Sequence, residues 1–192
     1  MNRTALRSTR YSFVIIAVAA LSAACAYETR TGPDRRQVSR GTTFAQGPDL
    51  GSCQYLAAPA GSKLRFHTYA DGVQIYRWSG AGWSFVGPEA VLTSDANGSD
   101  VVGIHYVGPT WESSSGSKVV GALVDRCTPD PNSIPWLLLR AVSTQGPGVF
   151  DSVTHIQRVN TSGGNAPSNP GNVVGEEARV PYTTEYFFYR AK

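Results

Sequence analysis

The sequence predicts a single all-β domain, an antiparallel sandwich or barrel-like fold, that follows a signal peptide and a disordered tether. Apolar residues alternate with a period of two more often than with the period of a helix. The apolar segments are short, rich in β-branched and aromatic residues, and separated by Gly, Pro, Asn and Ser. No amphipathic segment is long enough for a helix of more than two turns.

The amino-terminal segment, residues 1–25, has the layout of a secretory signal peptide. Three arginines, Arg3, Arg7 and Arg10, precede the uncharged apolar run FVIIAVAALSAA, which ends in small residues. This run is too short to span a bilayer as a helix. We therefore expect the protein to work outside the cytoplasm.

Two processing routes follow from the end of this segment. Cys25 directly after LSAA resembles a loose bacterial lipoprotein box, so a lipid on Cys25 would anchor the protein to an outer or cell-surface membrane. Cleavage after Ala24 or Ala26 would instead release a secreted or periplasmic protein.

A polar tether and one domain are predicted after the signal. Residues 26–51 are polar, mixed in charge and without apolar periodicity, which is typical of a flexible linker. Residues 52–192 form a domain of ordinary size, long enough to bury a core.

The charge of the processed chain is balanced. The whole chain has 17 Lys and Arg against 14 Asp and Glu, and residues 1–25 contain three Arg and no acid, which leaves 14 of each. A balanced chain has no global attraction for nucleic acid or for an anionic surface. We expect no nucleic-acid partner, and membrane contact only through a lipid on Cys25. The oligomeric state is left open.

Eight candidate strands follow in order along the domain. WSGAGW (78–83) and DANGSD (95–100) are predicted hairpin turns, and NTSGGNAPSNPGN (160–172) is a predicted long surface loop. The strands are predicted at 63–69, 72–78, 82–87, 101–108, 117–124, 136–142, 153–159 and 182–190.

Two cysteines remain in the domain, Cys53 and Cys127. In an oxidising compartment two thiols pair more often than they stay free, so we expect a disulfide between them. The chain has no C-x-x-C spacing that would favour a redox or metal pair.

Five blocks resemble a family of secreted bacterial and fungal proteins that is catalogued only as a domain of unknown function. They are GVQIY (72–76), HYVGPTWE (105–112), GSKVVG (116–121), IPWLLLRA (134–141) and IQRVNTSGG (156–164). The resemblance covers nearly the whole domain and implies export and a β-rich fold. It implies no activity, substrate or catalytic residue.

The chain departs from this family at two places. The family often has a cysteine two places after QIY and another in the loop after GGxAP, where this chain has Trp78 and SNPGN (168–172). The loss of both together suggests a lost disulfide, for which the Cys53–Cys127 bond would substitute.

His105, Glu112 and Lys118 are candidates for acid–base catalysis. They supply a base, an acid and a cation close together in the sequence. Strand alternation places His105 and Tyr106 on opposite faces, and Gly108-Pro109 then turns the chain, so convergence depends on that corner.

A ligand site is the preferred alternative to catalysis. An exposed aromatic ring beside a carboxylate is common in sugar-binding clefts, and Trp111 precedes Glu112. We expect a small polar or carbohydrate ligand on a rim formed by Tyr106, Trp111, Glu112 and Arg158, with Trp78, Trp83 and Trp136 as further aromatic candidates.

The sequence predicts no metal ion or cofactor. His67, His105 and His155 lack the spacing of metal ligands, and no phosphate-binding loop is present. Three functions stay open: a non-catalytic ligand-binding protein, an extracytoplasmic hydrolase that uses Glu112 and His105, and a purely structural envelope protein.

Overall fold

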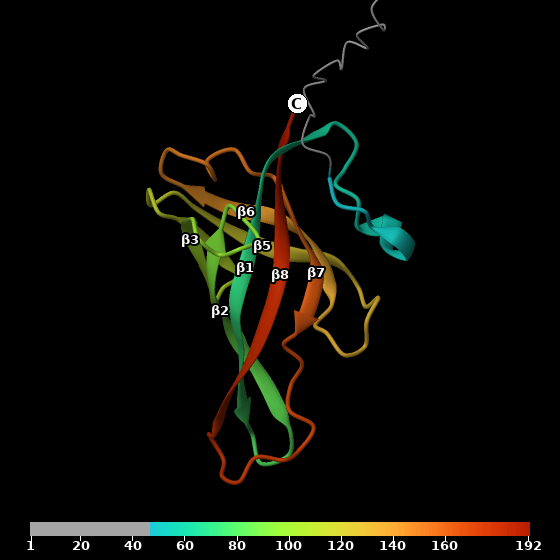
Figure 1. The fold of residues 1–192 in the computed structure, drawn as a ribbon, viewed down its shortest axis with the longest axis vertical. Helices are drawn as coiled ribbons and strands as arrows, with labels where there is room; N and C mark the ends of the chain where they lie inside the picture. Colours follow the sequence, from blue (N-terminus) through green and yellow to red (C-terminus); the bar gives the residue numbers. More distant parts are fainter. Residues whose placement is uncertain (1–46) are drawn as a thin grey trace, which may run out of the picture. The chain divides into compact units, whose positions relative to one another are not determined.

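Eight strands and one short 3-10 helix make up residues 47–192, the part of the chain that the computed structural model describes (Figure 1). The helix is η1 (Gly51–Leu56). The strands are β1 (Ser62–Trp78), β2 (Trp83–Thr93), β3 (Val101–Tyr106), β4 (Thr110–Ser113), β5 (Lys118–Cys127), β6 (Trp136–Gln145), β7 (His155–Gly163) and β8 (Glu177–Ala191).

The strands form one closed antiparallel barrel in chain order. Each strand pairs with the next, and β8 returns to pair with β1 from Ser62↔Ala191 to Arg77↔Glu177. These two longest strands lie side by side in Figure 1, β1 in green and β8 in red. The predicted all-β antiparallel fold is confirmed, and of its two forms the barrel is the one found.

Strand β1 joins two segments that the sequence divides. We predicted separate strands at 63–69 and 72–78 because the apolar alternation is interrupted between them. Gly72 instead lies within β1 against β2, where an added Cβ would meet the Glu89 carbonyl oxygen at 2.2 Å. The glycine therefore permits close approach of two backbones rather than a turn.

The predicted corner at Gly108-Pro109 is a hairpin turn. Strand β3 ends at Tyr106 and the chain returns as β4, a four-residue strand that the sequence analysis missed. Gly108 has a φ of +99°, which favours glycine, and the Thr110 hydroxyl donates a hydrogen bond to the Val107 carbonyl at 3.2 Å. The turn reverses the chain, so β4 pairs directly with β3.

The predicted loop at 160–172 begins later than expected. Strand β7 continues to Gly163 past an irregularity between Val159 and Ser162. The rest of the loop packs on the β1–β2 hairpin, where Gly171 lies so close to the Trp78 ring that an added Cβ would approach it to 2.6 Å. Trp78 and residues 168–172, the two places where the family often has cysteines, are therefore neighbours.

The inside of the barrel is packed with aromatic rings. Phe66 stacks on Phe188 with ring centroids 4.5 Å apart, and Phe150 contacts both rings. Trp111 meets Phe188 and Tyr186 edge to face. Two of these rings, Trp111 and Tyr186, also line the candidate site described below.

An outer layer explains the continuous apolar run of β6. Leu139 packs in the barrel core, whereas Leu138 packs on the outside, where Cys53 and Leu56 cover it. The segment is therefore apolar on both faces, as expected for a strand buried on both sides.

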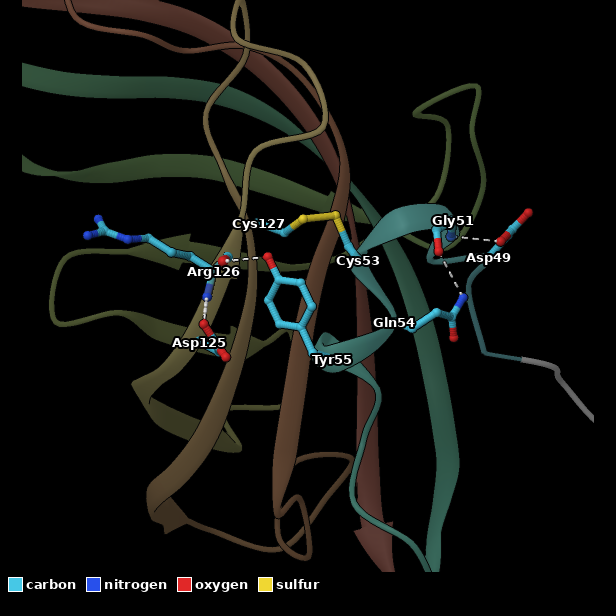
Figure 2. The surroundings of a disulfide bond; sticks show 8 residues. All are labelled: Asp49, Gly51, Cys53, Gln54, Tyr55, Asp125, Arg126 and Cys127. Carbon is cyan, nitrogen blue, oxygen red and sulfur yellow. Dashed lines mark hydrogen bonds between the residues drawn. A yellow bond between two sulfur atoms is a disulfide. The ribbon is translucent and has the colours of Figure 1, made fainter.

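The predicted disulfide between Cys53 and Cys127 is present, with the two Cα atoms 5.9 Å apart (Figure 2). It links η1 to the end of β5. Figure 2 also shows the Tyr55 hydroxyl donating to the Arg126 carbonyl at 3.2 Å. Both links hold the amino-terminal segment on the barrel wall.

The predicted signal peptide (1–25), with Cys25, lies outside the described residues, as does the predicted tether up to residue 46. At the end of that tether, Leu50 is buried against Phe187 and Tyr189. Within 47–192, no helix has both the length and the apolar character needed to cross a membrane.

Candidate functional site

A cavity of about 370 Å³ opens beside the β3–β4 turn. Strands β2 to β8 all contribute to its lining, so the closed barrel is what brings its walls together. Its volume falls within the range of small-molecule pockets, roughly 300–1,000 Å³.

The walls and the rim of the cavity are apolar. Pro88, Leu137 and Leu139 form part of the wall. At the rim, Phe85 and Leu123 are 56% and 54% exposed although both are large apolar residues. Exposed apolar side chains gathered at the mouth of a cavity are typical of a ligand-binding groove.

Trp111 and His105 form a stacked pair at the cavity. They are cross-strand partners of β4 and β3, their rings lie 4.3 Å apart and nearly parallel, and Trp111 is only 1% exposed. Gly121 makes room for the indole, because an added Cβ there would lie 3.1 Å from it. The indole N–H is fully buried without a hydrogen-bond partner in the described residues.

His105 is held as a neutral imidazole. Its Nδ1 lies 2.8 Å from the Thr110 carbonyl oxygen, which can only accept, so Nδ1 carries the proton and Nε2 is left as an acceptor. Burial lowers the pKa of His105 from 6.5 to about 3; the bond to Thr110 opposes this shift, and the positive charge of Arg158 adds to it. His105 therefore adds no positive charge to the cavity near neutral pH.

Arg158 is the charged residue of the cavity lining. It lies on β7 between Leu137 of β6 and Tyr186 of β8, its cross-strand partners. Its Nε and Nη2 atoms donate to the Pro135 carbonyl at 3.1 and 2.7 Å. This carbonyl fixes one edge of the guanidinium and leaves the remaining N–H groups available.

Two tyrosines of β8 add polar groups to the interior. The hydroxyls of Tyr182 and Tyr186 are fully buried, and so is the amide nitrogen of Gln74. Burial raises the pKa of both tyrosines, and the charge of Arg158 opposes that rise. Hydrogen bonding between the two hydroxyls, and from them to Gln74 and Arg158, also acts on these pKa values, so the four side chains form one polar group inside the barrel.

Glu112, Tyr106 and Lys118 form a separate cluster on the outer face. The Tyr106 hydroxyl donates to the Glu112 carboxylate at 2.9 Å, and Lys118 Nζ lies 3.1 Å from the same oxygen. These two hydrogen bonds lower the pKa of Glu112, and the carboxylate raises that of Lys118. All three groups are satisfied by one another.

The predicted rim site therefore divides into two parts. Trp111 and His105 point into the barrel, whereas Glu112 follows Trp111 on a strand and so lies on the opposite face. The expected exposed Trp111–Glu112 pair is absent, because Trp111 is a buried residue. Glu112 and His105 do not meet, contrary to the requirement of the hydrolase hypothesis. Of the predicted ligand residues, Trp111 and Arg158 are the two that line the cavity.

Several lining residues were missed in the sequence, among them Tyr186, Leu137 and Phe85. Strand alternation relates Tyr186 to its buried neighbours in the YFFY run, but only the register of β8 on β7 places it beside Arg158. Residues 47–192 contain no cluster of three or more His, Cys, Asp or Glu side chains placed to bind one metal ion.

The other candidate tryptophans lie away from the cavity. Trp78 and Trp83 pack together at the β1–β2 hairpin, 5.4 Å apart, and the Trp83 indole donates to the Asn169 carbonyl. Trp136 packs on the outer face near the disulfide.

A family model described as "Protein of unknown function (DUF3455)" matches residues 59–190, so the chain belongs to that family. The matched region extends from just before β1 almost to the end of β8. Comparison with curated proteins and with solved structures gave no match.

Proposed function

We propose that this member of the DUF3455 family is a non-catalytic binding protein that takes a small, largely apolar ligand into its barrel cavity. The observation that carries the proposal is the cavity itself, which combines apolar walls with the guanidinium of Arg158, a cation that has no acidic partner in the described residues. Ligand sites commonly combine a predominantly apolar lining with a few polar groups that fix orientation.

The lining favours an amphipathic ligand over a free sugar. Sugar binding by aromatic stacking needs an open ring face, but one face of Trp111 is covered by His105 and the ring is almost fully buried. Phe85, Pro88 and Leu137 offer apolar contacts instead. Carbohydrate therefore becomes the second ligand class to test.

Binding is favoured over the two other functions. The hydrolase hypothesis relied on Glu112 and His105, which lie on opposite faces of the barrel wall. Glu112 is engaged with Lys118, and His105 is neutral with a low pKa. A purely structural role would leave unexplained why Arg158 lines an apolar cavity without an acidic partner in the described residues.

We place this function outside the cytoplasm. The arginines and apolar run of residues 1–25 support export, and the Cys53–Cys127 disulfide is typical of an oxidising compartment. A lipid anchor on Cys25 stays a prediction. Mass spectrometry of the mature amino terminus tests it: a diacylglyceryl adduct on Cys25 supports the anchor, and an unmodified amino terminus at Cys25 or Tyr27 contradicts it.

The indole N–H signals of the four tryptophans in a ¹⁵N NMR spectrum test the cavity. Decanol, a neutral apolar probe, should shift the Trp111 signal, assigned by Trp111→Phe, because a ligand in the cavity would lie against the indole ring that lines it. The Trp136 signal on the outer face should not move. The same titration with oligosaccharides should leave Trp111 unchanged.

A rim variant provides a second readout. Leu123→Gln removes exposed apolar surface at the mouth and should weaken decanol binding, whereas Val124→Gln changes its equally exposed neighbour, which does not line the cavity, and should not. A Trp111 signal that stays fixed with every probe would overturn the proposal. A sugar-induced shift confined to Trp78 and Trp83 would move the site to the β1–β2 hairpin.

A further inference from the structure

We infer that the ligand of this cavity is an amphiphilic anion, whose negatively charged group binds Arg158 and whose apolar body lies along the cavity wall towards the rim. This inference rests on the proposed binding function and specifies the ligand class.

The guanidinium of Arg158 is fixed but not neutralised. The Pro135 carbonyl accepts two of its five N–H donors. None of the ion pairs in residues 47–192 includes Arg158, and none of the cavity-lining residues is Asp or Glu. A half-buried cation in protein is ordinarily paired with an anion or solvated, so this one is prepared for an incoming negative group.

The neighbours of Arg158 leave its charge uncompensated. Leu137 and Tyr186 flank it across the strands, and the stacked His105–Trp111 pair lines the same cavity. The charge of Arg158 acts to lower the pKa of four side chains, as expected for a guanidinium that faces the interior. They are Tyr76, His105, Tyr182 and Tyr186. Arg presents a planar fork of donors that matches a carboxylate or phosphate.

The uncharged polar groups favour the same kind of ligand. The Tyr186 hydroxyl can donate, and Tyr186 is the cross-strand neighbour of Arg158, whose charge acts on it. A hydroxyl donor beside a cation suits a group that only accepts hydrogen bonds. A ligand cation would meet the Arg158 charge in an apolar surrounding and be repelled.

The remaining surface fits an apolar body. Pro88 and Leu139 line the wall, and the exposed side chains of Phe85 and Leu123 continue the apolar surface to the solvent. A chain that extends from Arg158 towards this rim would bury apolar surface along its length. The charged end is thus held inside and the apolar end near the mouth.

Isothermal titration calorimetry with three probes of one chain length tests this inference. Decanoate, decanol and decylammonium, each below its micelle concentration, differ in charge but share the alkyl chain. We expect decanoate to bind about tenfold to a hundredfold tighter than decanol, as charge-assisted hydrogen bonds to a carboxylate imply. Decylammonium should bind more weakly than decanol.

Substitutions of Arg158 assign the difference to this residue. Arg158→Gln can still donate to Pro135, so it should reduce decanoate affinity to that of decanol and leave decanol affinity unchanged. Arg158→Lys keeps the charge and should retain part of the preference. Arg179→Gln removes an exposed arginine that pairs with Glu89 on the surface, and should change neither affinity.

The outcomes separate the two proposals. Equal binding of decanoate and decanol, with both lost in Leu123→Gln, would overturn the anion inference and keep the binding function. Absence of binding by any probe would overturn both. A decanoate preference that survives Arg158→Gln would also contradict the inference. Decyl phosphate, titrated in parallel, distinguishes a phosphate-bearing from a carboxylate-bearing source of the charge.

Discussion

His105 makes the stability of this barrel sensitive to acid, and the size of the effect follows from its burial. The ring is 2% exposed, stacks on Trp111 and donates from Nδ1 to the Thr110 carbonyl. The perturbation is a change from about pH 7 to about pH 4.5 in the wild type and in His105→Asn. An Asn amide can take over the donation to Thr110 but does not titrate.

The sign follows from the lowered pKa. In the unfolded chain the imidazole binds a proton below its ordinary pKa of 6.5, whereas in the folded protein it stays neutral until about 3. Stability is therefore present above pH 6.5 and is lost as the pH falls towards 3. At pH 4.5 the pH lies about two units below the pKa of 6.5 in the unfolded chain, while the folded imidazole is still neutral. Protonation of the unfolded chain therefore lowers the free energy of unfolding by about 3 kcal/mol.

Urea unfolding of both proteins at both pH values measures this quantity. His105→Asn should be less stable near neutral pH, by on the order of 2 kcal/mol, because the ring contacts with Trp111 are lost. On acidification the wild type should lose about 3 kcal/mol more than the variant, since the carboxylates common to both cancel. Equal losses in the two proteins would refute the burial of a neutral imidazole.

Three further predictions concern the barrel backbone, the disulfide and the outer face. Gly72→Ala should lower the free energy of unfolding by about 1–3 kcal/mol in urea, because its Cβ would collide with the β2 backbone. Gly82→Ala is the control, since its Cβ would enter open space and should change stability by less than about 0.5 kcal/mol; equal effects of the two substitutions would contradict the close approach at Gly72. Replacing Cys53 and Cys127 together by Ala should lower the free energy of unfolding by about 4 kcal/mol, because the disulfide closes a loop between residues 74 positions apart. Unchanged stability in thermal unfolding would count against a stabilising disulfide. Glu112→Gln should leave decanoate affinity unchanged in calorimetry, because the carboxylate lies on the outer face; a large loss would return the site to the predicted rim.

The fold was largely predictable because alternating apolar residues and turn signals are local properties. The β1–β2 and β2–β3 hairpins lie where WSGAGW and DANGSD were expected. The single long β1 was not predicted, because Gly72 has the same identity whether it serves a turn or a close backbone contact. Only the position of β2 distinguishes the two cases.

The cavity was predictable only in part because barrel closure determines its members. Trp111 and Arg158 were predicted as ligand residues from residue type, and both line the cavity, but the sequence did not indicate how far each side chain is exposed. The alternation of Trp111 and Glu112 along one strand could have separated them in the sequence, had Thr110–Ser113 been assigned as β4. The contact of Tyr186 with Arg158 depends on the pairing of β7 with β8 and has no local signal.

A crystal structure of the protein with decanoate would show whether the cavity holds the ligand and whether Arg158 binds its charge. We expect electron density for decanoate within the cavity beside the β3–β4 turn, with its carboxylate hydrogen-bonded to Arg158 and its alkyl chain extending towards Phe85 and Leu123. Decanoate bound elsewhere on the protein, with the cavity filled only by water, would contradict it.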